Sequence, residues 1–281
     1  MINQIYNENC LHTMGRMEDG FVDLTVTSPP YDDISEKLSI VNGEIVKSYE
    51  TKSILRDYKG YSWDIQAMAK ELFRVTKDGG VVVWVMNDPM VDGSESLASC
   101  YTRIIFQEVG WSTHDTMIYE KHNFNNPSNN RYHQMFEYMF VFSKGNPKIF
   151  NPIKDKPNKY AGQTAWGKNT SRQKDGSLKE KDKKVYSDFG MRGNIWRYTV
   201  GTSSNDDEIA FEHPAIFPSL LAKEMILSWS NPEDVVYDCF AGSGTTLKMA
   251  LQTNRKWIGS EISSEYCELI KRRLATARRL F

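Results

Sequence analysis

The hydrophobic pattern alternates between short β-branched runs and amphipathic stretches. The runs FVDLTVTS (21–28) and GGVVVWVMND (79–88) are typical of buried strands. Between them, WDIQAMAKELFRV (63–75) carries apolar residues three and four positions apart, which predicts a helix. This order of strand, helix and strand is the unit from which parallel sheets are built.

The same alternation continues towards the end of the chain. A helix is expected over about 95–109, followed by the strand-like runs MIYEK (117–121) and FEYMFVFSKG (136–145). Further along, residues 211–230 predict a helix, DVVYDCF (234–240) and KWIGSEIS (256–263) predict strands, and apolar stripes from 246 and over 266–281 predict helices. We therefore expect an α/β fold with a doubly wound, mostly parallel sheet, similar to a Rossmann fold.

One segment breaks this alternation. Residues 144–205 are rich in Lys, Asn, Gly and Pro and show no sustained periodicity, although interleaved aromatic residues argue against pure disorder. We predict a core half over 1–143, an inserted loop-rich region over 144–205 and a second core half over 206–281.

Composition excludes several classes of protein. Hydrophobic residues make up 40% and charged residues 25% of the 281 residues, which is ordinary for a globular protein. The longest apolar stretch, VVVWVM (81–86), is too short to span a membrane, and no charged-then-apolar signal opens the chain, so we expect a cytoplasmic protein. The four cysteines form no C-x-x-C pair, which predicts neither a metal site nor a disulfide framework.

Charge is distributed unevenly along the chain. The net charge is −1, yet residues 144–184 hold 12 Lys and Arg against 4 Asp and Glu, whereas residues 1–143 hold 12 against 20. A concentrated basic segment is the footprint expected for contacts to nucleic-acid phosphates.

A glycine turn follows the strand that ends in Asp238. Gly242 and Gly244 allow the backbone to approach a ligand closely, and Glu261 ends the next strand, where an acid accepts hydrogen bonds from ribose hydroxyls. A P-loop would need Gly-Lys-Ser/Thr, and a dinucleotide fingerprint would need a third glycine where Leu247 stands. S-adenosylmethionine remains as the candidate ligand, and a structural turn without a ligand is the alternative.

A second unusual strand end is TSPPY (27–31). Two neighbouring prolines fix two φ angles and remove two N–H donors, so the carbonyls of Ser28 and Pro29 and the Ser28 hydroxyl form a stiff set of acceptors beside Tyr31. Such a set suits an incoming amino group. The alternative is a turn that only ends a strand.

Together, TSPPY (27–31), DCFAGSGTT (238–246) and HPAIFP (213–218) resemble the exocyclic-amino DNA methyltransferases. The order of motifs resembles the β-ordered group, in which a catalytic half precedes a target-recognition region and a cofactor half. The resemblance implies a catalytic motif of Ser28, Pro29, Pro30 and Tyr31, and cofactor contacts from Asp238, Phe240, Gly242, Gly244, Thr245, Glu261, His213, Pro214 and Pro218. IYNENC (5–10) resembles the segment near the adenine ring, implicating Asn9 and Cys10, although the family more often has Asp where Asn9 stands. For His213, a capping or packing role is the alternative.

The implied reaction moves a methyl group from S-adenosylmethionine to the amine of a base flipped out of double-stranded DNA. Ser28 favours cytosine N(4), because Ser at this motif position is more common in cytosine enzymes, and adenine N(6) is the alternative. RNA or protein-glutamine acceptors, or a non-catalytic nucleic-acid-binding module, are further alternatives. No Pro-Cys pair is present, which disfavours methylation of a ring carbon.

The remaining predictions concern DNA and partners. Candidate DNA contacts are Lys168, Arg172, Lys174, Arg192, Asn194 and Arg197. A loop over 32–60, carrying Tyr49 and Tyr58, is expected to close over the site. The resemblance allows a cognate restriction endonuclease and a second copy of the chain as partners, and it places the protein at the nucleoid.

Overall fold

The computed structural model describes residues 1–42, 44–52, 63–123, 129–164, 167, 170–199 and 207–277. Contacts divide the chain into two compact units. The first comprises Met1–Asn151 together with Asn194–Phe281, and the second comprises Pro152–Gly193.

An eight-stranded sheet forms the centre of the first unit in the described part of the chain. In spatial order its strands are β1 (Gln4–Asn7), β16 (Lys256–Glu261), β15 (Val235–Asp238), β2 (Val22–Thr27), β5 (Thr76–Met86), β9 (Phe136–Ser143), β8 (Ser112–Lys121) and β14 (Ile195–Tyr198). The first five strands in this spatial order (β1, β16, β15, β2 and β5) are parallel to one another. Strand β9 is antiparallel to both of its neighbours, and β14 is parallel to β8. The predicted mostly parallel sheet is confirmed, and β14 shows that residues 195–198 complete this sheet.

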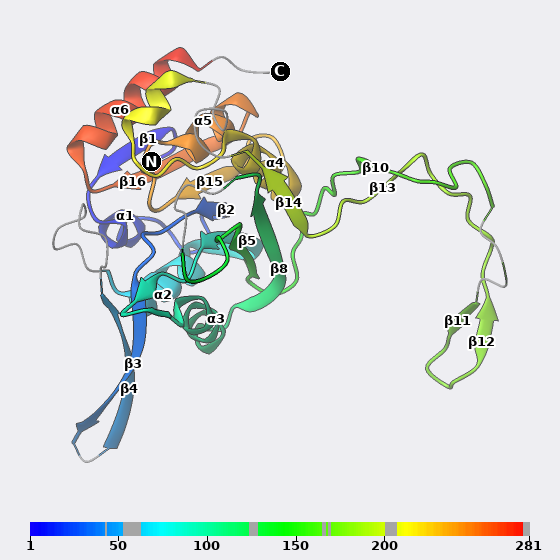
Figure 1. Cartoon of the computed structure of the whole chain (residues 1–281), viewed down its shortest axis with the longest axis horizontal. Helices are drawn as coiled ribbons and strands as arrows, with labels where there is room; N and C mark the ends of the chain where they lie inside the picture. The colour runs from blue at the N-terminus through cyan, green and yellow to red at the C-terminus, as the bar shows by residue number, and fades with distance from the viewer. Residues whose placement is uncertain are drawn as a thin grey trace. The chain divides into compact units, whose positions relative to one another are not determined.

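The helices form two groups that cover opposite faces of the sheet (Figure 1). One group contains α1 (Cys10–Gly15), α2 (Ile65–Val75) and α3 (Ala98–Val109); the other contains α4 (Ser219–Trp229), α5 (Thr245–Gln252), α6 (Ser264–Thr276) and the 3-10 helix η2 (Glu208–Glu212). This two-sided cover confirms the doubly wound arrangement.

Helix α2 illustrates how the sequence pattern becomes structure. The Asp64 side chain caps the helix by accepting hydrogen bonds from the backbone amides of Gln66 and Ala67. Met68 and Leu72, four residues apart, are both buried. Each such side chain contributes about 1.5–3 kcal/mol when fully buried, so the apolar stripe fixes which face meets the sheet.

The helix expected over 211–230 is shorter than predicted. The chain leaves η2 at Glu212, His213 is extended with φ −102°, and α4 begins only at Ser219. Pro214 and Pro218 explain the difference, because a proline has no amide hydrogen to donate and disfavours helical geometry in the residue before it.

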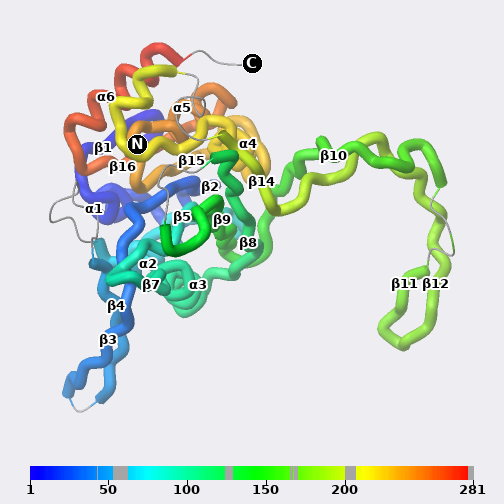
Figure 2. The backbone as a smooth tube through the Cα atoms, viewed as in Figure 1, coloured from blue at the N-terminus to red at the C-terminus, as the bar shows by residue number. Residues whose placement is uncertain are grey.

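The expectation of a loop over 32–60 is wrong for its described part. Residues 33–52 form an antiparallel hairpin of β3 (Asp33–Val41) and β4 (Glu44–Lys52), which extends past α2 and α3 in Figures 1 and 2. Asn42 has the left-handed φ of +53° that tight hairpin turns need, and the dipeptide Asn-Gly at 42–43 is the sequence signal for such a turn.

Tyr49 lies on this hairpin and contacts helix α3. Its ring packs edge-on against Tyr101 with centroids 5.9 Å apart, and its hydroxyl donates to the Glu108 carboxylate at 3.2 Å. The other tyrosine of the expected loop, Tyr58, lies outside the described residues.

The second unit has little regular structure. Its pairs are β10 (Lys156–Pro157) with β13 (Phe189–Gly190) and β11 (Thr170–Arg172) with β12 (Leu178–Glu180), and most of its described side chains are exposed. Its sequence holds 11 Lys and Arg against 5 Asp and Glu. The short strands β6 (Met90–Val91) and β7 (Ser94–Glu95) belong to the first unit.

Two kinds of feature are absent from the described residues. No helix among them is long and apolar enough to cross a membrane. No group of three or more His, Cys, Asp or Glu side chains among them is placed to hold a metal ion. Of the four cysteines, Cys100 is exposed and the other three are buried.

Candidate active site

The motifs converge on the carboxyl edge of four adjacent parallel strands. In register, Asn7 of β1 lies beside Glu261 of β16, and Tyr237 of β15 lies beside Thr25 of β2. Because parallel strands end at the same edge, the segments that follow them meet there. These segments are the residues around Asn9 that follow β1, the end of β16, the glycine turn and the proline elbow (28–31).

A direct side-chain contact joins the residue that precedes the proline elbow to the residue at which the strand before the glycine turn ends. The Thr27 hydroxyl donates to Asp238 Oδ1 at 2.7 Å, although the two residues are 211 positions apart. The backbone amide of Phe240 donates to the same oxygen at 3.1 Å. The residue before Ser28 and the first residue of the glycine motif are therefore held together inside the protein.

Asp238 is a buried acid. Burial raises the pKa of its carboxyl group to about 6, although the hydrogen bonds from Thr27 and Phe240 pull in the opposite direction. A cationic group placed beside this carboxylate would favour its ionised form.

The glycine turn has a backbone conformation that residues with a Cβ rarely adopt. Gly242 and Gly244 have φ angles of +51° and +78°, in the left-handed region. A Cβ at Gly244 would lie 2.8 Å from Ile270 Cγ1, and one at Gly242 would lie 3.2 Å from His213 Nε2. Thr245 directly follows as the first residue of α5 and is buried.

Glu261 lies beside this turn at the end of β16. Its Oε2 accepts the backbone amide of Gly242, and its Oε1 accepts the amide of Ser263, both at 2.8 Å. Burial raises the pKa of this carboxyl group above its ordinary value. A carboxylate has about four acceptor positions, so these two bonds fix its orientation and leave capacity for ligand hydroxyls.

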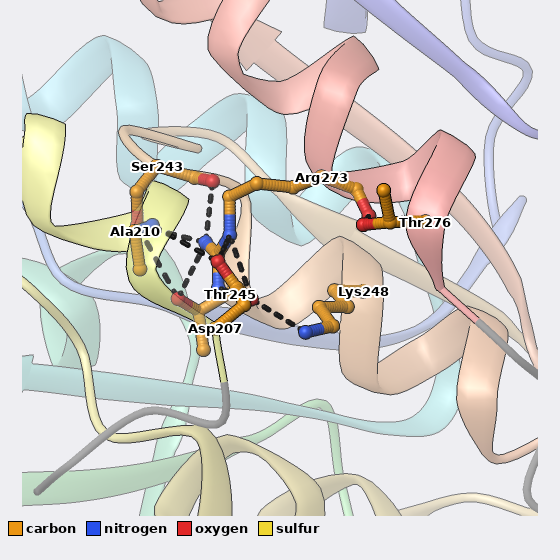
Figure 3. A network of polar contacts seen from close by, with 7 residues as sticks. All are labelled: Asp207, Ala210, Ser243, Thr245, Lys248, Arg273 and Thr276. Carbon is orange, nitrogen blue, oxygen red and sulfur yellow. Dashed lines mark hydrogen bonds and ion pairs between the residues drawn. The ribbon is translucent and has the colours of Figure 1, made fainter.

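A buried arginine supports the glycine turn from behind (Figure 3). Arg273 on α6 is fully buried and donates from Nη1 to the Ser243 carbonyl oxygen at 2.6 Å and to the Thr245 hydroxyl at 3.1 Å. Its Nη2 donates to Asp207 at 3.0 Å. Arg273 is not among the predicted site residues, although the sequence carries a signal for it, because its charge stands between Ile270 and Leu274 in an apolar stripe.

Asp207 carries the other end of this network. Its side chain caps η2 through the amide of Ala210 and pairs with the buried Lys248 of α5. Burial alone would raise the pKa of Asp207, but hydrogen bonds and charge from Arg273 and Lys248 outweigh burial and lower it. The network thus ties η2, α5 and α6 to the glycine turn.

His213 packs against the turn. The residue is 6% exposed, and the centroid of its ring lies 4.3 Å from that of the Tyr266 ring. Its Nδ1 is 2.8 Å from the carbonyl oxygen and 3.1 Å from the amide nitrogen of Ala215, and burial lowers its pKa. These contacts hold the His213 ring against other parts of the protein. Pro214 follows it directly, and Pro218 is the residue that precedes α4.

The proline elbow carries a chain of polar contacts. The hydroxyls of Ser28 and Tyr31 are 3.3 Å apart, and Tyr31 donates to Glu137 Oε2 at 2.6 Å. Burial, followed by the Glu137 charge, raises the pKa of Tyr31 well above its ordinary value, so the phenol stays neutral. Pro30 accepts the amide of Asp32 at 3.0 Å, which tightens the bend. Glu137 was missed from sequence because it lies in β9, 106 positions from Tyr31.

Aromatic side chains connect the two motifs. Phe240 packs edge-on against Trp63 with centroids 5.4 Å apart and against Trp84 at 6.1 Å. The Trp63 indole donates to Asp32 Oδ2 at 2.9 Å. Phe240 of the glycine motif is therefore linked through one indole to the residue that follows Tyr31.

Asn9 and Cys10 form the start of α1. Asn9 caps this helix, since its Oδ1 accepts the amide of Leu11 at 2.9 Å, and Cys10 is buried. Asn and Asp serve almost equally well as helix caps, so the departure from the Asp of the family preserves this local structure.

Three candidate DNA contacts have protein partners in the structure. Arg192 pairs with Asp155 within the second unit, Arg197 pairs with Glu120, and Asn194 Nδ2 donates to the Thr116 carbonyl oxygen at 3.1 Å. By contrast, the side chains of Arg172 and Lys174 are exposed at the hairpin of β11 and β12. Lys168 lies outside the described residues.

Comparisons with known proteins point to one family. A family model for N6/N4 DNA methylases matches residues 22–272. The orphan methyltransferase M.BamHII of Bacillus amyloliquefaciens is 48% identical over 258 residues, which cover 91% of this chain and 89% of that protein. The type II methyltransferase M.BglII of Bacillus subtilis is 26% identical over 273 residues, which cover 95% of this chain and 68% of that protein.

Solved structures share the fold. The cytosine-N4-specific PvuII DNA methyltransferase aligns with a TM-score of 0.65 at 18% identity, covering 96% of this chain and 85% of that one. A complex of M1.HpyAVI with S-adenosylmethionine aligns with a TM-score of 0.57 at 19% identity, covering 96% and 99%. With the family match over most of its length, the chain belongs to the N6/N4 DNA methylase family and is an S-adenosylmethionine-dependent DNA amino-methyltransferase.

Proposed function

We propose that the protein methylates the N(4) amino group of a cytosine turned out of duplex DNA, with the proline elbow as the catalytic motif. The observation that carries the site is the hydrogen bond from Thr27 to Asp238, because it fixes the elbow beside the glycine turn. The preference for cytosine rests on Ser28, the residue more common at this position in cytosine enzymes.

The residues around the glycine turn fit S-adenosylmethionine. Gly242 and Gly244 form a tight turn with left-handed φ angles, Glu261 retains acceptor capacity for ribose hydroxyls, and Asp238 offers a buried carboxyl for the cationic amino acid end. When bound, this cofactor supplies a methyl group that is already activated by its sulfonium sulfur. The protein therefore needs to orient the acceptor amine and supplies no nucleophile of its own.

The elbow supplies that orientation. The carbonyl oxygens of Ser28 and Pro29 and the Ser28 hydroxyl accept hydrogen bonds from the amino hydrogens of the base. These bonds favour a tetrahedral nitrogen, whose lone pair is otherwise delocalised into the ring, and they stabilise positive charge as it develops. The two prolines keep the acceptors in place before the base arrives.

Tyr31 offsets the cost of extracting the base. Flipping a base costs a few kcal/mol, and stacking on an aromatic ring returns roughly 1–3 kcal/mol. Tyr31 lies two residues after Pro29, the last of these acceptors, and its hydroxyl donates a hydrogen bond to Glu137.

The second unit, Pro152–Gly193, is proposed as part of the target-recognition region. Its excess of basic residues suits phosphate contacts, and the exposed Arg172 and Lys174 are the contacts best supported by the structure. Arg192, Asn194 and Arg197 would first have to leave their protein partners before they could reach DNA.

Adenine N(6) is the second candidate acceptor. The DNA adenine methyltransferase YhdJ of Escherichia coli is 41% identical over 97 residues, which cover 33% of this chain. A serine hydroxyl and an acidic side chain can each accept a hydrogen bond from either amine, so chemistry alone does not separate the two bases.

Methyl-transfer assays with tritiated S-adenosylmethionine test the proposal. The acceptors are duplex DNA amplified in vitro, RNA and a glutamine-containing protein, and digested DNA is resolved by mass spectrometry into N(4)-methylcytosine and N(6)-methyladenine. We expect methyl transfer to duplex DNA but not to RNA or the protein, with N(4)-methylcytosine as the product. Transfer should be lost in Ser28→Ala and Tyr31→Ala while cofactor affinity by calorimetry is retained. Methyladenine would overturn the base assignment, and unimpaired transfer in both variants would overturn the catalytic motif.

Two partners are separate proposals. M.BamHII is described as an orphan methyltransferase whereas M.BglII is described as type II, so the presence of a cognate restriction endonuclease is tested by the genes adjacent to this one. A homodimer is tested by light scattering of the purified protein, with and without duplex DNA.

A further inference from the structure

The Tyr31 side chain is held at both ends. Its backbone belongs to the proline elbow, and its hydroxyl donates to Glu137 Oε2 at 2.6 Å while lying 3.3 Å from the Ser28 hydroxyl. Restraints at Cα and at the para oxygen limit χ1, and because a phenol O–H lies in the plane of its ring, the direction of the hydrogen bond to Glu137 also favours one ring plane. The orientation of the Tyr31 ring therefore depends on a residue outside the motif.

Glu137 is itself braced. Its second oxygen, Oε1, lies 2.5 Å from Lys121 Nζ, and the two side chains are 13% and 20% exposed. Glu137 lies on β9 and Lys121 on the antiparallel neighbour β8, where the Lys121 amide also donates to the Met135 carbonyl oxygen at 2.7 Å. Each carboxylate oxygen thus has one partner, so the carboxylate cannot rotate without losing one of them.

The ion pair with Lys121 also compensates the negative charge of Glu137. A poorly hydrated carboxylate without a cation would be costly, and Lys121 supplies that cation. The Lys121 ammonium further lies 5.9 Å from the centroid of the Tyr119 ring. The phenol, the carboxylate and the ammonium therefore form one line of contacts from the proline elbow across the sheet to β8.

We propose that Glu137, braced by Lys121, is a positioning residue for methyl transfer: it holds the Tyr31 ring in the plane that meets the extruded base. The inference rests on the proposed function, in which Tyr31 stacks on that base. Preorganisation of the ring removes the need to order it when the base arrives, so the effect falls on the transfer step and leaves cofactor binding unchanged. Glu137 acts through Tyr31 and does not touch the reacting atoms.

A double-mutant cycle tests this role. Wild type, Tyr31→Phe, Glu137→Ala and the double variant are compared in single turnovers, with enzyme in excess over in-vitro amplified DNA and tritiated S-adenosylmethionine bound. Each single variant should slow transfer about tenfold, and the double variant should also be slowed about tenfold, because all three lose the same contact. Cofactor dissociation constants should stay within about twofold of wild type.

Two further variants separate positioning from general structure. Glu137→Gln keeps the volume and one acceptor oxygen, so it should fold even where Glu137→Ala does not and should show an intermediate loss of rate. Glu71→Ala removes a carboxylate that pairs with Arg74 on α2, away from Tyr31, and should transfer at the wild-type rate. Retention of an intermediate rate by Glu137→Gln would support the orienting hydrogen bond.

The outcomes distinguish this inference from the proposed function. If wild type methylates no DNA, the proposed function fails. If wild type methylates DNA and Tyr31→Phe or Glu137→Ala transfers at the wild-type rate, only the positioning role fails. A double variant slowed by the product of the single effects, or parallel loss of cofactor affinity, would likewise overturn the positioning role.

Discussion

The glycine turn and the proline elbow meet at one edge of the sheet and present opposite kinds of backbone. The glycine turn has left-handed φ angles at Gly242 and Gly244, which would let a ligand approach the main chain closely. The elbow replaces two amide donors with prolines and so presents acceptors. Under the proposed function, the cofactor and the amino group of the base therefore meet surfaces of different hydrogen-bonding character.

The two segments are also supported differently. Behind the glycine turn lies a fully buried arginine that contacts Ser243, Thr245 and Asp207. The elbow is supported by the contact of the preceding residue, Thr27, with Asp238 and by the contact of its own Tyr31 with Glu137. We infer that substitution of the arginine that supports the glycine turn impairs folding and cofactor binding. Substitutions that remove the contacts of the elbow should mainly slow the transfer step.

Replacement of Arg273 should have the largest effect. In Arg273→Met, Asp207 and the Ser243 carbonyl lose a buried charged donor, and breaking such a pair costs about 3–5 kcal/mol. Thermal unfolding should shift to much lower temperature, and calorimetric cofactor affinity should fall. The neighbouring Arg272 is exposed and pairs with Glu212, so Arg272→Met should cost about 0–1 kcal/mol. Equal destabilisation by the two substitutions would contradict the network in Figure 3.

Arg273 also shows where prediction from sequence stops. Six strands of the sheet (β2, β5, β8, β9, β15 and β16), α2, the glycine turn and the proline elbow follow from local residue patterns and were predicted, whereas β1 and β14 were not. The partners of Arg273 and Tyr31 lie in other elements, and sequence spacing carries no information about such contacts. The arginine is 66 positions from Asp207, and Tyr31 is 106 positions from Glu137.

The hairpin of β3 and β4 was predicted as a loop, because its sequence pattern is weak. Residues 33–52 alternate weakly between polar and apolar, and most of the distal side chains are exposed, so burial gives little signal there. The turn dipeptide at 42–43 was the informative feature. Likewise, the shortened start of α4 followed from the chemistry of Pro214 and Pro218, which apolar periodicity does not register.

Gly244→Ala should have the next largest effect. Its φ of +78° is unfavourable for alanine, and the new Cβ would lie 2.8 Å from Ile270, so Ile270 or the turn must shift. We expect a loss of about 1–3 kcal/mol in unfolding free energy together with weaker cofactor binding. Gly15→Ala is the matched control, because Gly15 has ordinary φ and no atom within 4 Å of a new Cβ. An unchanged cofactor affinity in Gly244→Ala would place the ligand away from this turn.

Asp238 predicts a pH dependence of cofactor binding. Burial raises its folded pKa to about 6 from 3.8, so the folded protein binds the extra proton between these values, and stability from this group falls as pH rises through that range. A cationic ligand favours the ionised carboxylate. Cofactor affinity should therefore strengthen from pH 5 to pH 7.5, by at most about tenfold for each pH unit.

Asp238→Asn isolates this contribution. The amide oxygen can still accept from Thr27 and Phe240, so the link between elbow and turn is kept while the titration is removed. Calorimetry across the same pH range should show a flatter profile for the variant. Glu261 also has a raised pKa, so a variant profile as steep as that of wild type would assign the dependence to Glu261 or another group.

The smallest expected effects lie in the second unit and concern DNA alone. Arg172→Ala and Lys174→Ala should each weaken binding to duplex DNA uniformly across sequences and reduce the salt slope of the association constant by about 1, because each proposed phosphate contact releases one counterion. Fluorescence anisotropy between low and moderate salt measures the slope. Lys271→Ala, which removes an exposed lysine paired with Glu268 on α6, should leave the slope unchanged. A slope reduced equally by Lys271→Ala would mean that overall charge, and not the exposed hairpin of the second unit, governs DNA affinity.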